Sequence, residues 1–299
     1  MAEKQTEGRH AEAKGLELRS DAAILAILAD GQSRAASSVA EAASAIAAAA
    51  ELAAQSIRDG GRLVYAAAGS SGLMALADAL ELPGTYGIAR ERIVVLLAGG
   101  QEALVDMRGG PEDDGDAATA EVNALQLDAR DCVIGVTASG HTPYPLAALD
   151  AARRAGARTI GIANNEGAAI FGKADVGICL KTPPEVIAGS TRMGAGTAQK
   201  IALNMLSTLM AIRLGHVHDG MMVNVVADNE KLRGRARGIV EAAAGVDGTR
   251  AEAALKASDG AVKPAVLIAA GAATLAEAEA VLARHDGQLR PSLAALAKG

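Results

Sequence analysis

Short apolar runs that alternate with helical stretches are the feature of this sequence that most constrains its fold. The runs lie at residues 62–68, 93–97, 132–138, 159–163 and 176–180. Apolar strands of this length, separated by helices, predict an α/β fold with a doubly wound parallel sheet and helices on both faces. Ligands in such sheets bind beyond the carboxyl ends of the strands, so the turns that follow the runs are the first places to look for function.

Helical stretches are expected on either side of the sheet. Two helices are predicted within residues 21–59, further helices follow the first and third runs to about residues 80 and 155, and a long one spans about 193–214. The basic, glycine-punctuated stretch at 233–238 indicates a boundary. We therefore predict a sheet domain at residues 1–238 and a smaller C-terminal segment at 239–299, either a separate helical domain or a cap on the sheet. Gly245, Gly260 and Gly287 divide that segment into three short Ala-rich helices.

Composition excludes several classes of protein. Of the 299 residues half are apolar, which is enough for a large core, and the net charge is −6 without a basic stripe, which argues against nucleic acid as a partner. The N-terminus has no apolar signal core and the apolar runs are too short to span a bilayer, so we expect a cytoplasmic protein with no membrane partner. Cys132 and Cys179 each lie within an apolar run, which predicts buried strand thiols.

Two turns share one design: a buried run ends, small hydroxyl residues and glycine follow, and a helix begins. They are Gly69–Gly72 and Ser139–Thr142. Unpaired N–H groups and the positive end of the dipole make a helix N-terminus a site for anions, although one such turn alone is more often a simple helix cap. Two of them after strands of one sheet favour phosphate. Neither matches a dinucleotide or nucleotide-triphosphate loop, and His216 and His218 lack a third metal ligand, so we predict no cofactor and no metal.

A third candidate segment, Pro184–Arg192, leads into the long helix. Ser190 and Thr191 are predicted to cap that helix and to face an anion, and Arg192 adds a positive charge.

The three segments together resemble the phosphosugar site of the sugar isomerase (SIS) domain. Within that superfamily the chain is most similar to the N-acetylmuramic acid 6-phosphate etherases and to the related glucokinase regulatory proteins. The matching segments are collinear between about residues 60 and 235: 78–87, 98–100, 138–144, 189–193, 195–200, 203–208 and 229–232. The C-terminal helices fit the small tail domain of that family.

The resemblance implies a lyase that cleaves the D-lactyl ether at C3 of a phosphorylated amino sugar by elimination and then adds water. Such a reaction needs a base at C2 and an acid for the departing oxygen, which two carboxyls can supply. The family's two active-site glutamates fall on Glu81 and Glu112. Taken alone, Glu112 after a proline is typical of an ordinary helix N-terminus, whereas Glu81 near the C-terminal end of a helix opposes the dipole.

The same resemblance assigns the substrate-binding residues and suggests a homodimer with a shared active site, in which Glu230 and Lys231 act across the interface. The expected binding residues are Gly69, Ser70, Ser71, Gly72, Ser139, Gly140, Thr142, Glu185, Ser190, Thr191, Arg192 and Lys231.

Three positions depart from the family, because Leu73, His141 and Gly194 stand where cations are usual. Each lost charge-assisted hydrogen bond is worth roughly 1.5–3 kcal/mol, so these changes bear on which ether substituent is accepted.

Two alternatives to the etherase stay open on the same fold: an aldose–ketose phosphosugar isomerase, and a phosphosugar-binding regulator without catalysis.

Overall fold

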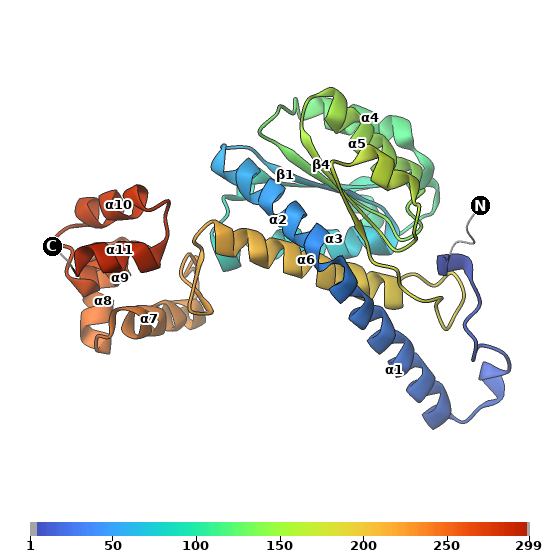
Figure 1. The fold of residues 1–299 in the computed structure, drawn as a ribbon, viewed down its shortest axis with the longest axis horizontal. Helices are drawn as coiled ribbons and strands as arrows, with labels where there is room; N and C mark the ends of the chain where they lie inside the picture. Colours follow the sequence, from blue (N-terminus) through green and yellow to red (C-terminus); the bar gives the residue numbers. More distant parts are fainter. Residues whose placement is uncertain (1–4, 298–299) are drawn as a thin grey trace. The chain divides into compact units, whose positions relative to one another are not determined.

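A five-stranded parallel sheet is the centre of the computed structural model, which describes residues 5–297 (Figure 1). The strands are β1 Leu63–Ala67, β2 Ile93–Leu97, β3 Cys132–Val136, β4 Arg158–Ala163 and β5 Val176–Cys179. They are ordered β2-β1-β3-β4-β5, and every neighbouring pair is parallel. Both the α/β class and the position of each strand agree with the sequence prediction.

The chain forms two units, which we describe separately. The first unit comprises residues up to 79 together with 91–207, and the second comprises 80–90 together with 208 onwards. The helices of the first unit are α1 Asp21–Ser38, α2 Ala43–Arg58, α4 Gly115–Ala124 and α5 Pro143–Arg154. Two long helices run from the first unit into the second: α3 Gly69–Tyr86 and α6 Gly194–Arg213.

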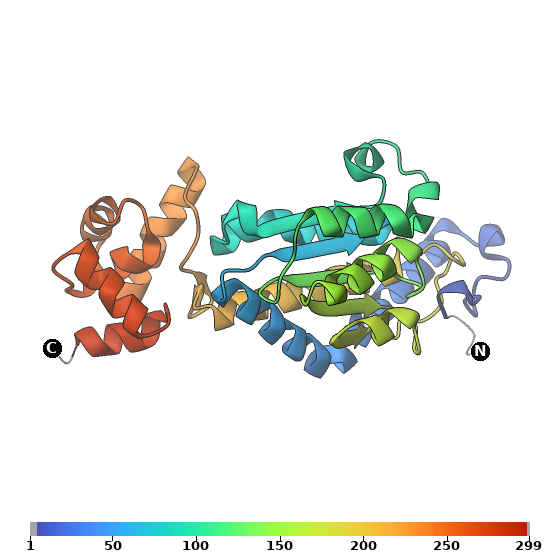
Figure 2. The ribbon, with the colours of Figure 1, turned by 90° about the horizontal axis from the view of Figure 1, so that it is seen from above.

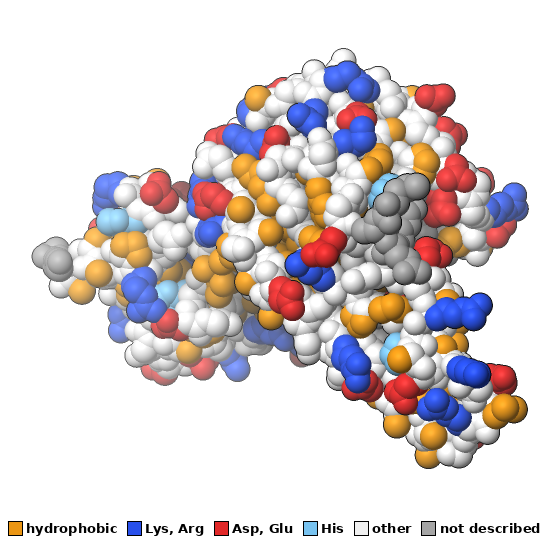
Figure 3. Space-filling view, turned by 45° about the vertical axis from the view of Figure 1, so that its right-hand side comes forward, with side chains coloured by type: hydrophobic (Ala, Val, Ile, Leu, Met, Phe, Trp, Pro, Cys, Tyr) orange, Lys and Arg blue, Asp and Glu red, His pale blue; other side chains and the backbone are white. Residues whose placement is uncertain are grey.

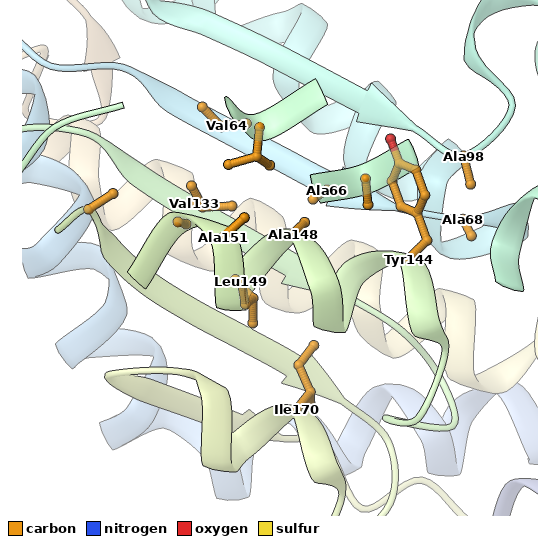
Figure 4. Close-up of a cluster of buried hydrophobic side chains, with 14 of the residues drawn as sticks. Val64, Ala66, Ala68, Ala98, Val133, Tyr144, Ala148, Leu149, Ala151 and Ile170 are labelled. Carbon is orange, nitrogen blue, oxygen red and sulfur yellow. The ribbon is translucent and has the colours of Figure 1, made fainter. Parts of the chain in front are cut away.

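Helices cover both faces of the sheet because the strands are apolar on both faces. All residues of β1 and β3 are buried. Val64, Ala66 and Val133 point to the face covered by α5, where they pack with Leu149 and Ile170 (Figure 4). Helix α4 lies beside α5, and α2 contacts the sheet through β1, β3, β4 and β5 (Figures 1 and 2).

The other face of β1 carries a buried polar contact. Tyr65, whose neighbours in β1 point to the α5 face, donates its hydroxyl to Asp78 of α3 at 3.0 Å. The Asp78 carboxylate also accepts hydrogen bonds from Asn204 (2.8 Å) and Ser207 (2.9 Å) of α6. Burial raises the pKa of Asp78, and these hydrogen bonds oppose the shift. Asp78 therefore joins β1, α3 and α6, a link that the sequence did not reveal.

Two helix boundaries differ from expectation. The hydroxyl-rich turn Gly69–Gly72 is itself the first turn of α3, and the helix continues past Pro83 to Tyr86 rather than ending near residue 80. Cys132 and Cys179 are free thiols in strands, as predicted, but only Cys132 is buried, and Cys179 is partly exposed.

In the described part of the second unit, five helices follow α6, where three were expected. They are α7 Glu230–Ala244, α8 Gly248–Ala257, α9 Val262–Ala270, α10 Leu275–Arg284 and α11 Leu289–Leu296, and a short hairpin precedes them, with β6 Val217–His218 and β7 Met221–Met222. Helix α7 runs continuously through residues 238 and 239, where the sequence predicted a boundary. The break at Gly271 was missed, although Thr274 caps α10 by accepting from the N–H of Glu277, and the Glu277 carboxylate accepts from the N–H of Ala273.

Among residues 5–297 no single helix is long and apolar enough to cross a membrane. Helices α9 and α10 meet the length and composition criteria only as a pair, and they are bent by 106° with respect to each other.

Stability of the second unit is expected to rise between about pH 8 and pH 10. Lys263 of α9 is largely buried, with Nζ 3.2 Å from the carbonyl oxygen of Gly287, and burial lowers its pKa from 10.5 to about 8. In this range the unfolded chain keeps the proton that the folded protein has lost, so Lys263 alone increases the free energy of unfolding by about 2 kcal/mol. The neighbouring His216, with a pKa lowered to about 4 by burial and by Lys263, is neutral throughout.

Urea unfolding followed from pH 7 to pH 10 checks this. The Lys263→Met variant should lose the rise, and an equal rise in the variant would contradict the assignment to Lys263.

Candidate active site

The candidate site lies at the point where the strand order reverses. The chain passes from β1 outward to β2 and returns to β3 on the other side of β1, so β1 and β3 are neighbours, with Ala67 opposite Val136. In open parallel sheets ligands bind in the crevice at this point. Gly69–Gly72 follows β1 and Ser139–Thr142 follows β3. The structure therefore brings the two predicted anion-binding turns to one edge of the sheet.

The first turn starts the long helix α3. Gly69 has φ of 54°, in the left-handed region where a side chain is disfavoured, and it directs the chain from β1 into the helix. Gly72 lies against β2, because a Cβ there would come 2.2 Å from Cδ1 of Leu97. Ser70 is half-buried and Ser71 is buried. The N–H of Gly72 donates to the carbonyl oxygen of Ala68 at 3.0 Å. The N–H groups that come before it in the first turn have no partners within the helix, so they can face an anion.

Glu112 lies beside this turn. A Cβ built on Gly69 would be 4.0 Å from Oε2 of Glu112, although 43 residues separate the two in sequence. The neighbouring Pro111 accounts for this position: it packs over Gly99, whose Cβ would approach the proline ring at 3.3 Å. Gly99 has φ of 85° and follows β2. The Ala98–Gly100 turn thus leaves room for the Pro111 ring and holds an exposed carboxylate at the N-terminus of α3.

Glu112 also begins a helix, as its sequence context indicated. It lies in a short 3-10 helix, Gly110–Asp113, directly before α4. The cap of α4 is Asp114, whose carboxylate accepts from the N–H of Ala117 at 2.8 Å. Capping is therefore done by Asp114, and the Glu112 side chain is exposed.

The second turn is a cluster of hydroxyls around Thr142. Its Oγ1 lies 2.7 Å from Oγ1 of Thr137 and 3.5 Å from Oγ of Ser139. Gly140 has φ of 76° and packs so tightly that a Cβ would come 2.2 Å from Cβ of Ala168. His141 is exposed, and its Nδ1 lies 3.0 Å from the Ser139 carbonyl oxygen. Hydrogen bonds between the hydroxyls hold the turn, and the close packing at Gly140 leaves no room for a side chain there.

The third segment is built differently from the prediction. Glu185, not Ser190 or Thr191, caps α6: its two carboxylate oxygens accept from the N–H groups of Gly194 (3.0 Å) and Ala195 (2.8 Å). Ser190 and Thr191 are half-buried in the preceding turn. The negative charge on Glu185 is stabilised by the helix dipole, and the first-turn donors of α6 are already used.

The same cap explains one departure from the family pattern. A Cβ at Gly194 would lie 3.0 Å from Cβ of Ala35 and 3.1 Å from Oε2 of Glu185. A lysine at this position would crowd both neighbours. Arg192 is exposed two residues earlier and is the cation of this segment.

Replacing Glu185 by glutamine should destabilise the protein by about 2 kcal/mol, because one of two buried N–H groups would then face an amide donor. The side chain keeps its size, so the loss reports the hydrogen bond and the charge. Urea unfolding at pH 7 measures it. Glu166→Gln is the control, since Glu166 is exposed and forms an ion pair with Lys181 at the surface. Equal stability of the two variants would contradict a structural role for Glu185.

Two further predicted residues belong to the second unit. Glu81 lies in α3 and Lys231 in α7, and both side chains are exposed. Glu81 is not at the very end of its helix, which continues to Tyr86. Among residues 5–297 no group of three or more His, Cys, Asp or Glu side chains is arranged to hold a metal ion.

Charge is mixed on the surface seen in Figure 3. Lys and Arg side chains alternate with Asp and Glu over this face, without a broad region of one sign.

Comparisons with known proteins agree with this geometry. The model of the glucokinase regulatory protein N-terminal SIS domain matches residues 45–153, and the SIS domain model matches residues 112–214. These matches cover the sheet and all three segments described above.

Several proteins similar over most of this chain carry the same name. An N-acetylmuramic acid 6-phosphate etherase from Mycolicibacterium smegmatis is 42% identical over 97% of this chain and 98% of its own length. Etherases from Streptomyces avermitilis (45% identical, 84% of this chain, 80% of that protein) and Deinococcus radiodurans (44%, 89% and 87%) are similar to the same degree. On this identity and coverage, and with an SIS-type sheet carrying the expected turns, the chain belongs to the N-acetylmuramic acid 6-phosphate etherase family.

Proposed function

We propose that this protein is a lyase that cleaves the D-lactyl ether of N-acetylmuramic acid 6-phosphate, giving N-acetylglucosamine 6-phosphate and D-lactate. The observation that supports it most is the position of Glu112, an exposed carboxylate beside the N-terminus of α3 at the reversal of the strand order. The names of the relatives supply the substrate class.

The chemistry calls for an acid/base pair. Opening of the sugar ring gives an aldehyde that acidifies the C2 proton, a base removes this proton, and the C3–O bond then breaks as the lactyl oxygen receives a proton. Water adds to the resulting double bond and restores the hydroxyl at C3. Carboxyl groups can perform each of these proton transfers. We assign Glu81 as the general acid and Glu112 as its acid/base partner.

The phosphate would be bound by the hydroxyl-rich turns. N–H groups of Ser70 and Ser71 and the hydroxyls of Ser139 and Thr142 offer neutral donors at the ends of adjacent strands. Ser190, Thr191 and Arg192 would add donors and one positive charge, and Glu185 would act on the substrate only through the α6 cap that it forms. With Leu73, His141 and Gly194 in place of cations, recognition of the lactyl carboxylate would rest on fewer charges.

We further propose a homodimer in which the partner subunit's Glu81 completes the site. Glu81 follows Gly72 by nine residues of one continuous helix, which is about 14 Å along the axis and longer than a hexose. The glutamate of the same subunit is therefore badly placed for a sugar whose phosphate lies at Gly69–Gly72. Exposed apolar side chains on α3 (Leu73, Leu80) and α6 (Met205, Ile212) favour a protein partner on these helices. Lys231 would reach the substrate across the same interface.

Because a charged sugar phosphate does not cross a bilayer unaided, the cytoplasm is the proposed place of action.

Incubation of the purified protein with N-acetylmuramic acid 6-phosphate tests the function. D-lactate should appear in amounts equal to the N-acetylglucosamine 6-phosphate formed. Conversion of an aldose phosphate to a ketose phosphate without lactate would indicate the isomerase instead, and binding of the sugar phosphate without turnover would indicate a regulator. Either result would refute the etherase.

A further inference from the structure

The N-terminal segment Gln5–Glu7 is held by a buried side chain that follows β4. Thr6 is 2% exposed and Asn165 is 3% exposed. The N–H of Thr6 donates to Oδ1 of Asn165 at 3.2 Å, and Nδ2 of Asn165 donates to Oγ1 of Thr6 at 2.9 Å. The oxygen and the nitrogen of the Asn165 amide thus both form hydrogen bonds with Thr6, which lies 159 positions earlier in the sequence.

The same amide group also holds the second anion-binding turn. Nδ2 of Asn165 lies 3.4 Å from the carbonyl oxygen of Ala138 and 3.2 Å from that of Ser139. Ser139 in turn contacts Thr142 and the N–H of His141 through its hydroxyl. An amide NH₂ has two hydrogens for these three acceptors, so its orientation depends on all of them, including Thr6. Loss of the Thr6 hydroxyl would leave the buried amide less well fixed and the Ser139–Thr142 turn less rigid.

The segment also touches the third candidate region. A Cβ on Gly8 would lie 3.1 Å from Cγ of Pro184, and a Cβ on Gly189 would lie 3.7 Å from Oε2 of Glu7. Residues 5–8 therefore contact, directly or through Asn165, two of the three segments that the proposed function assigns to phosphosugar binding.

We propose that Thr6 and Asn165 are positioning residues, and that the N-terminal segment sets the affinity of the site for phosphosugars by fixing the Ser139–Thr142 turn. The inference rests on the proposed function for the identity of the ligand. Neither residue needs to touch the substrate. Their effect is on the entropy of the turn, since a turn that is already ordered loses less freedom when the phosphate binds.

Thr6→Val tests the proposal, because it removes the hydroxyl and keeps the shape and the backbone N–H. We expect the Kd for N-acetylglucosamine 6-phosphate, measured by calorimetry, and the KM for N-acetylmuramic acid 6-phosphate to rise roughly three- to tenfold, with kcat changed by less than about twofold. Thr6→Ser restores the hydroxyl and should recover the affinity. Thr119→Val is the matched control, because the Thr119 hydroxyl bonds to the Gly115 carbonyl of its own helix.

A Thr6→Val protein with a lower melting temperature and unchanged Kd would show a purely structural role and overturn the proposal. So would an equal rise of Kd in Thr119→Val, or a loss in kcat alone. Wild-type release of lactate together with an unaffected Thr6→Val variant refutes only the positioning role. Wild-type binding without lactate refutes the etherase, and the Kd comparison then still decides the role of Thr6.

Discussion

The Glu112→Gln variant is expected to lose a factor of about 10² to 10⁴ in kcat, with KM changed only a few-fold. The amide has the size of the carboxylate but neither takes up nor delivers a proton. Glu112 is exposed beside Gly69, so the substitution should leave the fold and its stability unchanged. Steady-state release of D-lactate measures the effect.

Asp113→Asn is the matched control, since Asp113 is the adjacent exposed carboxylate in the same 3-10 helix. It should keep close to wild-type kcat. Retention of most activity by Glu112→Gln, or an equal loss in the control, would remove Glu112 from the reaction.

A shared site adds a second expected result to the same variant. When inactive Glu112→Gln and inactive Glu81→Gln subunits are mixed and allowed to exchange, a mixed dimer contains one site with both substitutions and one site with neither. Activity should therefore reappear upon mixing. Activity that stays at the level of the separate variants, despite proven exchange, would contradict the proposal that Glu81 acts in the partner subunit's site.

Gly140→Ala is the second substitution with a large expected effect. A Cβ at this position overlaps Cβ of Ala168 at 2.2 Å and lies 3.1 Å from Cβ of Ala163, on a backbone with φ of 76°. Overpacking and the left-handed backbone together should cost about 3 kcal/mol of stability. The turn would move, and with it the donors of Ser139 and Thr142, so kcat/KM should fall roughly a hundredfold.

Urea unfolding and lactate release check both parts. Gly172→Ala is the control, because no atom outside its own neighbourhood lies within 4 Å of the added Cβ and its φ is not positive. A Gly140→Ala protein with wild-type stability and activity would show that the turn tolerates movement and does not position the substrate.

The sheet could be predicted from the sequence because each strand carries its own local signal. A strand that is buried on both faces can be located from its own apolar residues, without knowing which strands lie beside it. All five strands were predicted within two residues of their observed ends. Helix ends were harder. The helix after the first strand was expected to end near residue 80, whereas α3 accommodates Pro83 and continues to Tyr86. The sequence analysis did not predict the helix break at Gly271, although Thr274 followed by Glu277 three residues later is typical of a helix N-terminus.

The site was predictable only where its residues follow strands. Gly69–Gly72 and Ser139–Thr142 lie at the same edge of the sheet because β1 and β3 are neighbouring parallel strands. The contacts of Asp78, Asn165 and Glu185 were not foreseen, because each is a buried hydrogen bond whose partners depend on tertiary packing. Ser190 was expected to cap α6, but a glutamate nine residues before the helix does so through the fold of the loop.

The measurement that tests the central claim most directly is isotope transfer from solvent during turnover of N-acetylmuramic acid 6-phosphate. In D₂O, elimination and hydration require that the product N-acetylglucosamine 6-phosphate carry deuterium at C2. In H₂¹⁸O the hydroxyl of the released D-lactate should remain unlabelled, because the bond between C3 and the ether oxygen is the one that breaks. Labelled lactate hydroxyl, or product without deuterium at C2, would contradict elimination across C2 and C3 and with it the proposed lyase reaction.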